Sequence, residues 1–152
     1  MSITLQGLDH VVLRVTNPDQ AVAFYCNALG CHIERRQDDI GLIQLRAGNS
    51  LIDLVPVDSP LGRKGGPAAG SEGHNMDHFC LQVQPFDEAA IRAHLAAHGV
   101  TAGPLEERYG AQGLGPSIYL QDPDGNTVEL KGPPTQPTQS VCAIPFIRQA
   151  ES

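Results

Sequence analysis

The chain has 152 residues, a formal net charge of -7 and a pI near 5.2. This acidic balance argues against nucleic acid and anionic membrane surfaces as partners, because both are polyanions, and it favours a small-molecule substrate. Hydrophobic residues make up 41% of the chain and charged residues 18%, which excludes wholesale disorder. The N-terminus lacks a basic region followed by an apolar run, and the four cysteines form no CxxC pair, so we expect reduced thiols and a cytoplasmic location.

Two short stretches of the chain predict nearly the same strand. Residues 8–15 read LDHVVLRV and residues 76–83 read MDHFCLQV, with four identical positions in eight at an offset of 68. Successive side chains of a strand point to opposite faces, and in both stretches the apolar residues favour one face. We therefore expect an internal duplication that places His10 and His78 at the same point of its two copies.

A helix is predicted after each of these strands. In the first copy Asn17 is the expected N-cap, Pro18 the first helical residue and Gly30 the terminator. In the second copy Asp87 is the expected N-cap and Gly99 the terminator. The matching order of strand and helix supports the duplication.

Three more strands are predicted in each half, so that each half reads β-α-β-β-β. The turn-forming DPDG at 122–125 separates the last two strands of the second half. Well-marked strands lie in IGLIQLRA, SLIDLVPV, PSIYLQD and NTVELKG, and weaker ones in HIERRQ at 32–37 and within 104–109.

The predicted fold class is α+β, with two βαβββ modules forming a cupped mixed sheet and helices on the outer face. Polar and apolar residues alternate along these strands, and a sheet face exposed to solvent explains this alternation equally well. The scarcity of Lys and Glu among the polar residues, however, favours a polar cup. The expected divisions are residues 6–55 for the first module, 56–75 for a linker rich in glycine and proline, 76–131 for the second module and 132–152 for a tail. We expect the apolar segment 141–147 of this tail to dock on the body or on a neighbouring subunit.

With these features the chain resembles the vicinal oxygen chelate superfamily, which includes glyoxalase I, extradiol dioxygenases and bleomycin resistance proteins. The resemblance covers residues 6–131 and rests on the two histidine strands with their helices and on YLQDPDGNTVEL at 119–130. It implies that His10, Asp53, His78 and Glu129 bind a metal. The repeat supports this assignment, because LIDL at 51–54 aligns with TVEL at 127–130 and so pairs Asp53 with Glu129.

Nitrogen and oxygen ligands together suit a divalent ion such as Zn, Ni, Fe, Mn or Co, with open positions for two vicinal substrate oxygens. Chelation stabilises negative charge on those oxygens, and Glu129 or Asp53 is the expected catalytic proton carrier. Asp53 departs from the Glu that is usual in the family and is one methylene shorter. Direct ligation by Asp53 makes the site similar to that of glyoxalase I, whereas without it His10, His78 and Glu129 form the triad of non-haem iron oxygenases.

The resemblance leads us to expect a metal-dependent, glyoxalase-like lyase or isomerase that works as a homodimer. An Fe(II)-dependent extradiol dioxygenase is the alternative, and a non-catalytic drug-binding protein is a third reading, weakened by the absence of tryptophan for aromatic stacking. Whether the modules pair within or between chains is left open. Further side chains on the polar faces of the predicted strands are expected to contact substrate: Arg14, Gln44, Arg46, Cys80, Gln82 and Tyr119.

Overall fold

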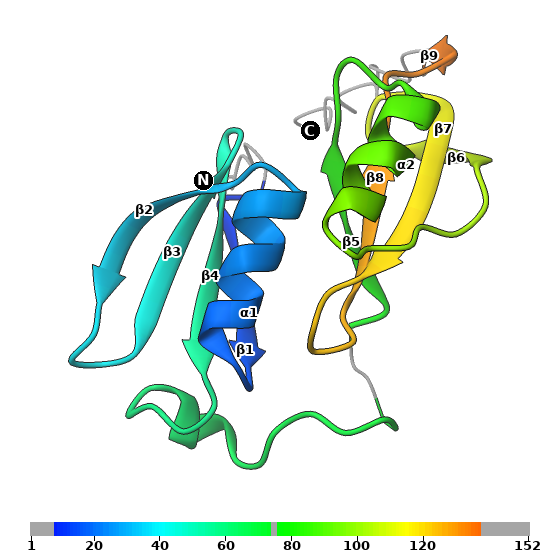
Figure 1. The fold of residues 1–152 in the computed structure, drawn as a ribbon. Coiled ribbons are helices and arrows are strands. Elements are labelled where there is room, and N and C mark those ends of the chain that lie inside the picture. The colour runs from blue at the N-terminus through cyan, green and yellow to red at the C-terminus, as the bar shows by residue number, and fades with distance from the viewer. Residues whose placement is uncertain (1–7, 74–75, 138–152) are drawn as a thin grey trace, which may run out of the picture.

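The computed structural model describes residues 8–73 and 76–137, which form two modules of the same design (Figure 1). The predicted two-module α+β fold is confirmed. The first module contains β1 (His10–Val15), α1 (Pro18–Ala23), the π-helix η1 (Phe24–Ala28), β2 (His32–Gln37), β3 (Leu42–Ala47) and β4 (Ser50–Pro56). The short 3-10 helix η2 (Gly62–Gly65) follows, and then come β5 (His78–Gln82), α2 (Glu88–Ala97), β6 (Glu106–Gly110), β7 (Gly113–Gln121), β8 (Thr127–Lys131) and β9 (Gln136–Pro137).

Each module folds into its own mixed sheet. The strand order is β1-β4-β3-β2 in the first sheet and β5-β8-β7-β6 in the second, where β9 also pairs with β7. The first and last strands of each module are parallel neighbours, and the other pairs are antiparallel. Val12 lies opposite Asp53 in the first sheet and Cys80 lies opposite Glu129 in the second, so the duplication extends to the register.

Local sequence signals set the helix boundaries. The side chain of Asn17 accepts a hydrogen bond from the backbone N–H of Gln20, and Asp87 accepts one from Ala90, as expected of N-caps. Gly30 follows η1 with a φ of 81°, in the left-handed region that favours glycine. None of the helices in the described segments is long and apolar enough to cross a membrane.

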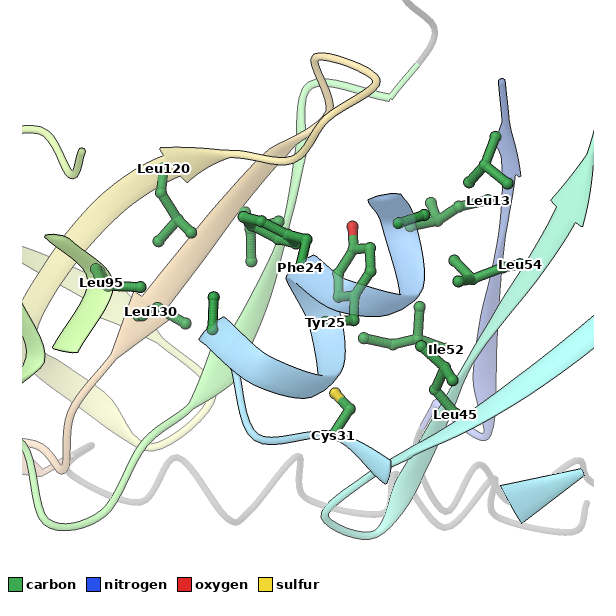
Figure 2. Close-up of a cluster of buried hydrophobic side chains, with 14 of the residues drawn as sticks. Leu13, Phe24, Tyr25, Cys31, Leu45, Ile52, Leu54, Leu95, Leu120 and Leu130 are labelled. Atoms are coloured by element: carbon green, nitrogen blue, oxygen red, sulfur yellow. The ribbon is translucent and has the colours of Figure 1, made fainter. Parts of the chain in front are cut away.

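The helical segment α1–η1 lies between the two sheets and packs on both (Figure 1). Figure 2 shows Tyr25 and Phe24 of η1 in one buried cluster with Leu54 of the first sheet and Leu120 of the second. The apolar faces of both sheets therefore meet in a shared core. Because strand side chains alternate between faces, the two polar faces point away from this core. Within 8–73 and 76–137 no strand of one sheet pairs with a strand of the other, so each module keeps a sheet of its own.

Polar contacts also join the modules. The hydroxyl of Tyr25 donates to Asp122 at 2.7 Å, and the backbone N–H of Thr16 donates to Asp124 at 2.9 Å. Both acceptors belong to the turn between β7 and β8, where Asp122 also accepts from the backbone N–H of Asn126. This turn thus anchors the second module to the first. The predicted docking of residues 141–147 concerns a segment outside the described residues.

Candidate metal centre

The polar face of the first sheet holds His10 and Asp53. His10 begins β1 and is exposed, whereas Asp53 on β4 is only 5% exposed. Gln44 donates a hydrogen bond to Asp53 Oδ2 at 3.1 Å. The other oxygen, Oδ1, is buried and has no hydrogen-bond partner among the residues that the structure describes. A buried carboxylate oxygen without a partner is costly, and a cation, a water molecule or a substrate group could satisfy it.

The polar face of the second sheet holds His78 and Glu129 at equivalent positions. The imidazole Nε2 of His78 lies 3.2 Å from Glu129 Oε2. The other oxygen of Glu129, Oε1, accepts a hydrogen bond from the fully buried hydroxyl of Ser117. The carboxylate is therefore fixed by β7 and turned toward the histidine of β5.

An aspartate precedes each histidine and orients its ring. Nδ1 of His10 lies 2.6 Å from Asp9, and Nδ1 of His78 lies 2.6 Å from Asp77. A carboxylate can only accept, so Nδ1 carries the proton and Nε2 is left as the lone-pair donor. Carboxylates hold metal-bound histidines in this way in many proteins. The bond with Asp9 is the main cause that raises the pKa of His10, and the charge of Asp53 adds to it.

Sequence reasoning assigned no role to Asp9 and Asp77. The repeat contained a signal for such a role, because an aspartate directly precedes the histidine in both copies. The alternation of polar and apolar residues in a strand does not by itself require an aspartate there. The structure brings each of them to the imidazole nitrogen that a metal would not use. They are thus candidates for orienting the two histidines.

The donor atoms fit a divalent metal ion. Two ligands bonded to one metal at about 2.1 Å lie roughly 3.0 to 3.4 Å apart, and the atoms of His78 and Glu129 are separated by 3.2 Å. Asp53 Oδ1 adds a buried oxygen without a partner in the described part of the chain. However, no three potential ligands gather into one group within 8–73 and 76–137. One chain therefore holds two separate pairs of candidate donors, His10 with Asp53 and His78 with Glu129, one on each polar face; we call these pairs half-sites.

Two of the arginines expected to contact substrate have contacts of their own. Arg14 donates to the carbonyl oxygens of Gly62 and Pro67 at 3.0 Å and also to that of Gly66. It thereby holds the η2 loop beside β1. Its Nε is buried and has no acceptor among the described residues. Arg46 instead pairs with Glu34 at 2.7 Å, on the same polar face.

The second polar face carries the other expected substrate contacts. Cys80 and Gln82 of β5 are exposed, and the ring of Tyr119 packs edge-on against His78 with centroids 5.2 Å apart. Desolvation and the neighbouring Glu129 carboxylate raise the pKa of the Cys80 thiol to about 12, so it is protonated at neutral pH. Arg108 lies over the Tyr119 ring at 4.1 Å, a contact that the sequence pattern did not indicate.

A cavity of about 770 Å³ lies between the helical segment of the first module and the second sheet, and Tyr119 is among its lining residues. It is bounded by η1, the loop after α2 and the end of β7, and none of the four expected metal ligands is among its described lining residues. The candidate metal centre is therefore on the open polar faces and not in this cavity.

Comparisons with known proteins show what this chain is similar to. The chain is 33% identical over 135 residues to an ethylmalonyl-CoA/methylmalonyl-CoA epimerase of Cereibacter sphaeroides, covering 82% of this chain and 96% of the relative. It is 29% identical to the human mitochondrial methylmalonyl-CoA epimerase, covering 84% and 74%. Among solved structures, integron cassette protein VCH_CASS1 from the V. cholerae mobile metagenome matches with a TM-score of 0.69 and 27% identity, covering 87% and 98%.

The model of the Glyoxalase/Bleomycin resistance protein/Dioxygenase superfamily matches residues 7–130, which include both half-sites. Members of this family are mostly metal-dependent enzymes. On this match, together with the duplicated fold and the paired donor groups, the chain belongs to the Glyoxalase/Bleomycin resistance protein/Dioxygenase superfamily.

Proposed function

We propose that this chain is a metal-dependent lyase or isomerase whose metal centres form between two copies in a homodimer. In each centre His10 and Asp53 of one copy face His78 and Glu129 of the other. The observation that carries this proposal is the back-to-back arrangement of the modules, which turns the two half-sites of one chain away from each other. A second copy is then needed to bring complementary halves together.

The open sheet edges suit such a partner. Strands β1 and β5 each lie at one end of their sheet, next to the histidine-bearing face. Val12 on the polar face of β1 is 51% exposed, and Cys80 and Gln82 of β5 are exposed as well. An unpaired edge strand with exposed apolar side chains is a ready surface for pairing with another chain. Pairing β1 of one copy beside β5 of the other would form the polar cup.

A bound divalent ion supplies the positive charge that stabilises two vicinal substrate oxygens as negative charge develops on them. Around it, His10 and His78 contribute Nε2, each ring being oriented by its aspartate. Glu129 contributes Oε2, because Ser117 occupies Oε1. Arg14 lies on the same face as Asp53, where it holds the η2 loop beside the half-site.

Asp53 is the group best placed to carry a proton. Its Oδ2 is held by Gln44, while its Oδ1 is free within the described residues. We propose that this oxygen takes a proton from the substrate carbon next to the chelated oxygens. The electron pair of the broken C–H bond moves onto the adjacent carbonyl oxygen. In a lyase or isomerase Asp53 returns the proton to a neighbouring carbon, whereas in an epimerase Asp53 keeps it and a second donor, such as a water molecule, protonates the same carbon from the opposite face. The two epimerase relatives support the last of these outcomes.

The first experiment measures metal in protein purified without chelators. Wild type should hold a divalent metal, and His78→Ala should lose it. His98→Ala is the matched control, because His98 bonds to a backbone carbonyl at 2.9 Å in α2 and lies away from both half-sites. Wild-type protein that stays metal-free after incubation with Zn²⁺, Co²⁺, Ni²⁺, Mn²⁺ and Fe²⁺ would refute the proposal.

The second experiment identifies the chemistry. The metal-loaded enzyme is incubated in D₂O with methylmalonyl-CoA, and separately with the hemithioacetal of methylglyoxal and glutathione. Enzyme-dependent deuterium incorporation or product formation is expected with one of them. The dioxygenase alternative uses the same ligands, His10, His78 and Glu129, but needs no proton transfer by Asp53. It predicts O₂ consumption with a catechol that requires Fe²⁺.

A further inference from the structure

We infer that Ser117 and Arg108 are positioning residues that decide which oxygen of Glu129 faces the metal. The inference rests on the proposed metal centre and deepens it. Neither residue belongs to the expected ligand set or to the expected substrate contacts. Their role follows from a chain of hydrogen bonds that runs across β6, β7 and β8 and ends on the carboxylate.

The last link of this chain is the hydroxyl of Ser117. Its side chain is fully buried on β7, and its Oγ donates to Glu129 Oε1 at 2.5 Å. Oε2 then lies 3.2 Å from His78 Nε2, at the spacing of two donors on one metal. Glu129 thus has one oxygen held by the protein and one available to the ion. This arrangement favours binding of the metal through one oxygen over binding through both.

Arg108 fixes the direction of the Ser117 hydroxyl. Its Nη1 donates to Ser117 Oγ and to the Ser117 carbonyl oxygen, both at 3.1 Å. A guanidinium has no acceptor and keeps its charge, so the hydroxyl can only accept from Arg108 and must direct its own proton elsewhere. The available acceptor is Glu129. Arg108 is itself held by Glu106 at 2.8 Å and by the Tyr119 ring beneath it.

The first module has no equivalent of this arrangement, although its sheet has the same register. Gln44 lies opposite Asp53 as Tyr119 lies opposite Glu129, so the position two residues before Gln44 corresponds to Ser117. That position is Leu42, which has no hydroxyl. The fold therefore does not require a serine there. The asymmetry matches the different roles proposed for the two carboxylates, with Glu129 as a fixed ligand and Asp53 with a free oxygen.

The test is the affinity for Co²⁺ of full-length metal-free protein, measured by competition with a chromophoric chelator. Ser117→Ala should weaken binding by about 10- to 100-fold, as is typical when a group that orients a metal ligand is removed. The visible absorption bands of the bound Co²⁺ should also change, because the freed carboxylate can offer both oxygens. Thr135→Val is the matched control: it removes a hydroxyl that donates to a carboxylate, Glu107, at 2.9 Å in the same module without touching Glu129.

A second variant tests whether a general folding defect, and not the lost hydroxyl, explains weaker Co²⁺ binding. Arg108→Met should weaken Co²⁺ binding in the same direction, and the double variant should bind no more weakly than Ser117→Ala alone, since Arg108 acts through the hydroxyl. Equal Co²⁺ affinities and spectra for wild type and Ser117→Ala would overturn this inference and leave the proposed function intact. Additive losses in the double variant would also overturn it. Wild-type protein that binds no Co²⁺ would overturn the proposed function and this inference together.

Discussion

At the level of single residues, Asp53 and Glu129 are equivalent in the repeat but differ in their surroundings. Both oxygens of Glu129 have neighbours, Ser117 on one side and His78 on the other. Asp53 is held through Oδ2 by Gln44 and keeps Oδ1 free in the described part of the chain. A ligand benefits from being fixed, whereas a base needs a free lone pair. The two carboxylates are therefore suited to different tasks.

Replacing Asp53 separates these tasks. Asp53→Asn keeps the hydrogen-bonding shape but cannot take a proton, so kcat should fall by about 10²- to 10⁴-fold, the usual contribution of a general base. Metal content should remain, because His10, His78 and Glu129 are intact. The matched variant Asp53→Glu keeps a carboxylate and should retain more activity. Deuterium exchange into substrate and elemental analysis measure the two effects, and loss of metal in Asp53→Asn would instead show that Asp53 is an essential ligand.

Cys80 reports on the charge of Glu129 in the metal-free protein. Desolvation first and the Glu129 carboxylate second raise the pKa of this thiol to about 12. A raised pKa favours the protonated thiol, so alkylation by iodoacetamide at pH 8 should be roughly a thousandfold slower than for a free cysteine. Glu129→Gln removes the carboxylate charge, which lowers the pKa of the thiol, and should therefore speed alkylation.

Peptide mapping by mass spectrometry would measure this rate residue by residue. Cys31 is the internal control, because burial first and Cys26 second raise its pKa to about 11 and it belongs to the other module. Its alkylation rate should be the same in wild type and in Glu129→Gln. If the substitution speeds both cysteines equally, the cause is loosening of the fold and not the lost charge.

At the level of elements, local signals predicted most of the secondary structure. The weakly signalled strand at 32–37 is β2, and the one expected within 104–109 is β6. Asn17 and Asp87 are the N-caps that their side-chain chemistry indicated. The π-helix η1 was not predicted, because the pattern Phe24, Tyr25, Ala28 also fits an α-helix. Residues of η1 pack in the core with both sheets, and such tertiary contacts are not encoded locally.

The hydrogen bond from Tyr25 to Asp122 joins η1 to the turn between β7 and β8. Tyr25→Phe removes it and should lower the free energy of unfolding by about 1.5–3 kcal/mol at pH 7, the range for bonds to a charged group. Burial first, and then the charge and hydrogen bond of Asp122, raise the pKa of Tyr25. A raised pKa means that this contribution is complete below the ordinary tyrosine pKa of about 10 and is lost as the pH rises above it.

Urea denaturation of wild type and Tyr25→Phe at pH 7, 9 and 10.5 tests the sign. The difference in unfolding free energy should be the same at pH 7 and 9 and smaller at pH 10.5, because the unfolded wild-type chain then gains from ionising its tyrosine. A difference that stays constant up to pH 10.5 would show that Tyr25 is not held in its neutral form.

The η2 loop is tied to β1 by Arg14, and the loop itself carries two trypsin sites, Arg63 and Lys64. Arg14→Met leaves the carbonyl oxygens of Gly62 and Pro67 without these donors. Local opening of the loop should then become more frequent, and cleavage by trypsin should be at least about tenfold faster, because tenfold already corresponds to the loss of one of these charged hydrogen bonds.

Arg46→Met is the matched control for the loop. Arg46 lies on the same polar face but pairs with Glu34 and makes no hydrogen bond to the described loop residues. Its cleavage rate should equal that of wild type. Equal rates for all three proteins would show that the contact with Arg14 does not restrain the loop.

At the level of the whole molecule, the alternation of side chains along each strand predicted which residues share the polar face of a sheet. It could not predict which faces of the two sheets pack against each other. The sequence places His10 and His78 on polar faces, and the structure confirms this for both sheets. It is the tertiary position of α1–η1 between the sheets that turns these faces outward (Figure 1). The same strands could form a cup within one chain or between two, and for this chain we propose that the half-sites pair between two copies.

Mixing two inactive variants tests the assembly directly. In His10→Ala the first half-site is broken, and in His78→Ala the second, so neither homodimer contains an intact centre. If the centres form between copies, a heterodimer of the two variants has two different centres. One centre carries both substitutions. The other is intact, because it joins His10 of the His78→Ala chain to His78 of the His10→Ala chain. Co-refolding an equal mixture should therefore restore metal binding to about a quarter of the wild-type level, since half of the dimers are mixed and each has one good centre of two. Light scattering should give twice the chain mass for wild type and variants, and a mixture that exchanges subunits yet restores no metal would exclude centres shared between copies.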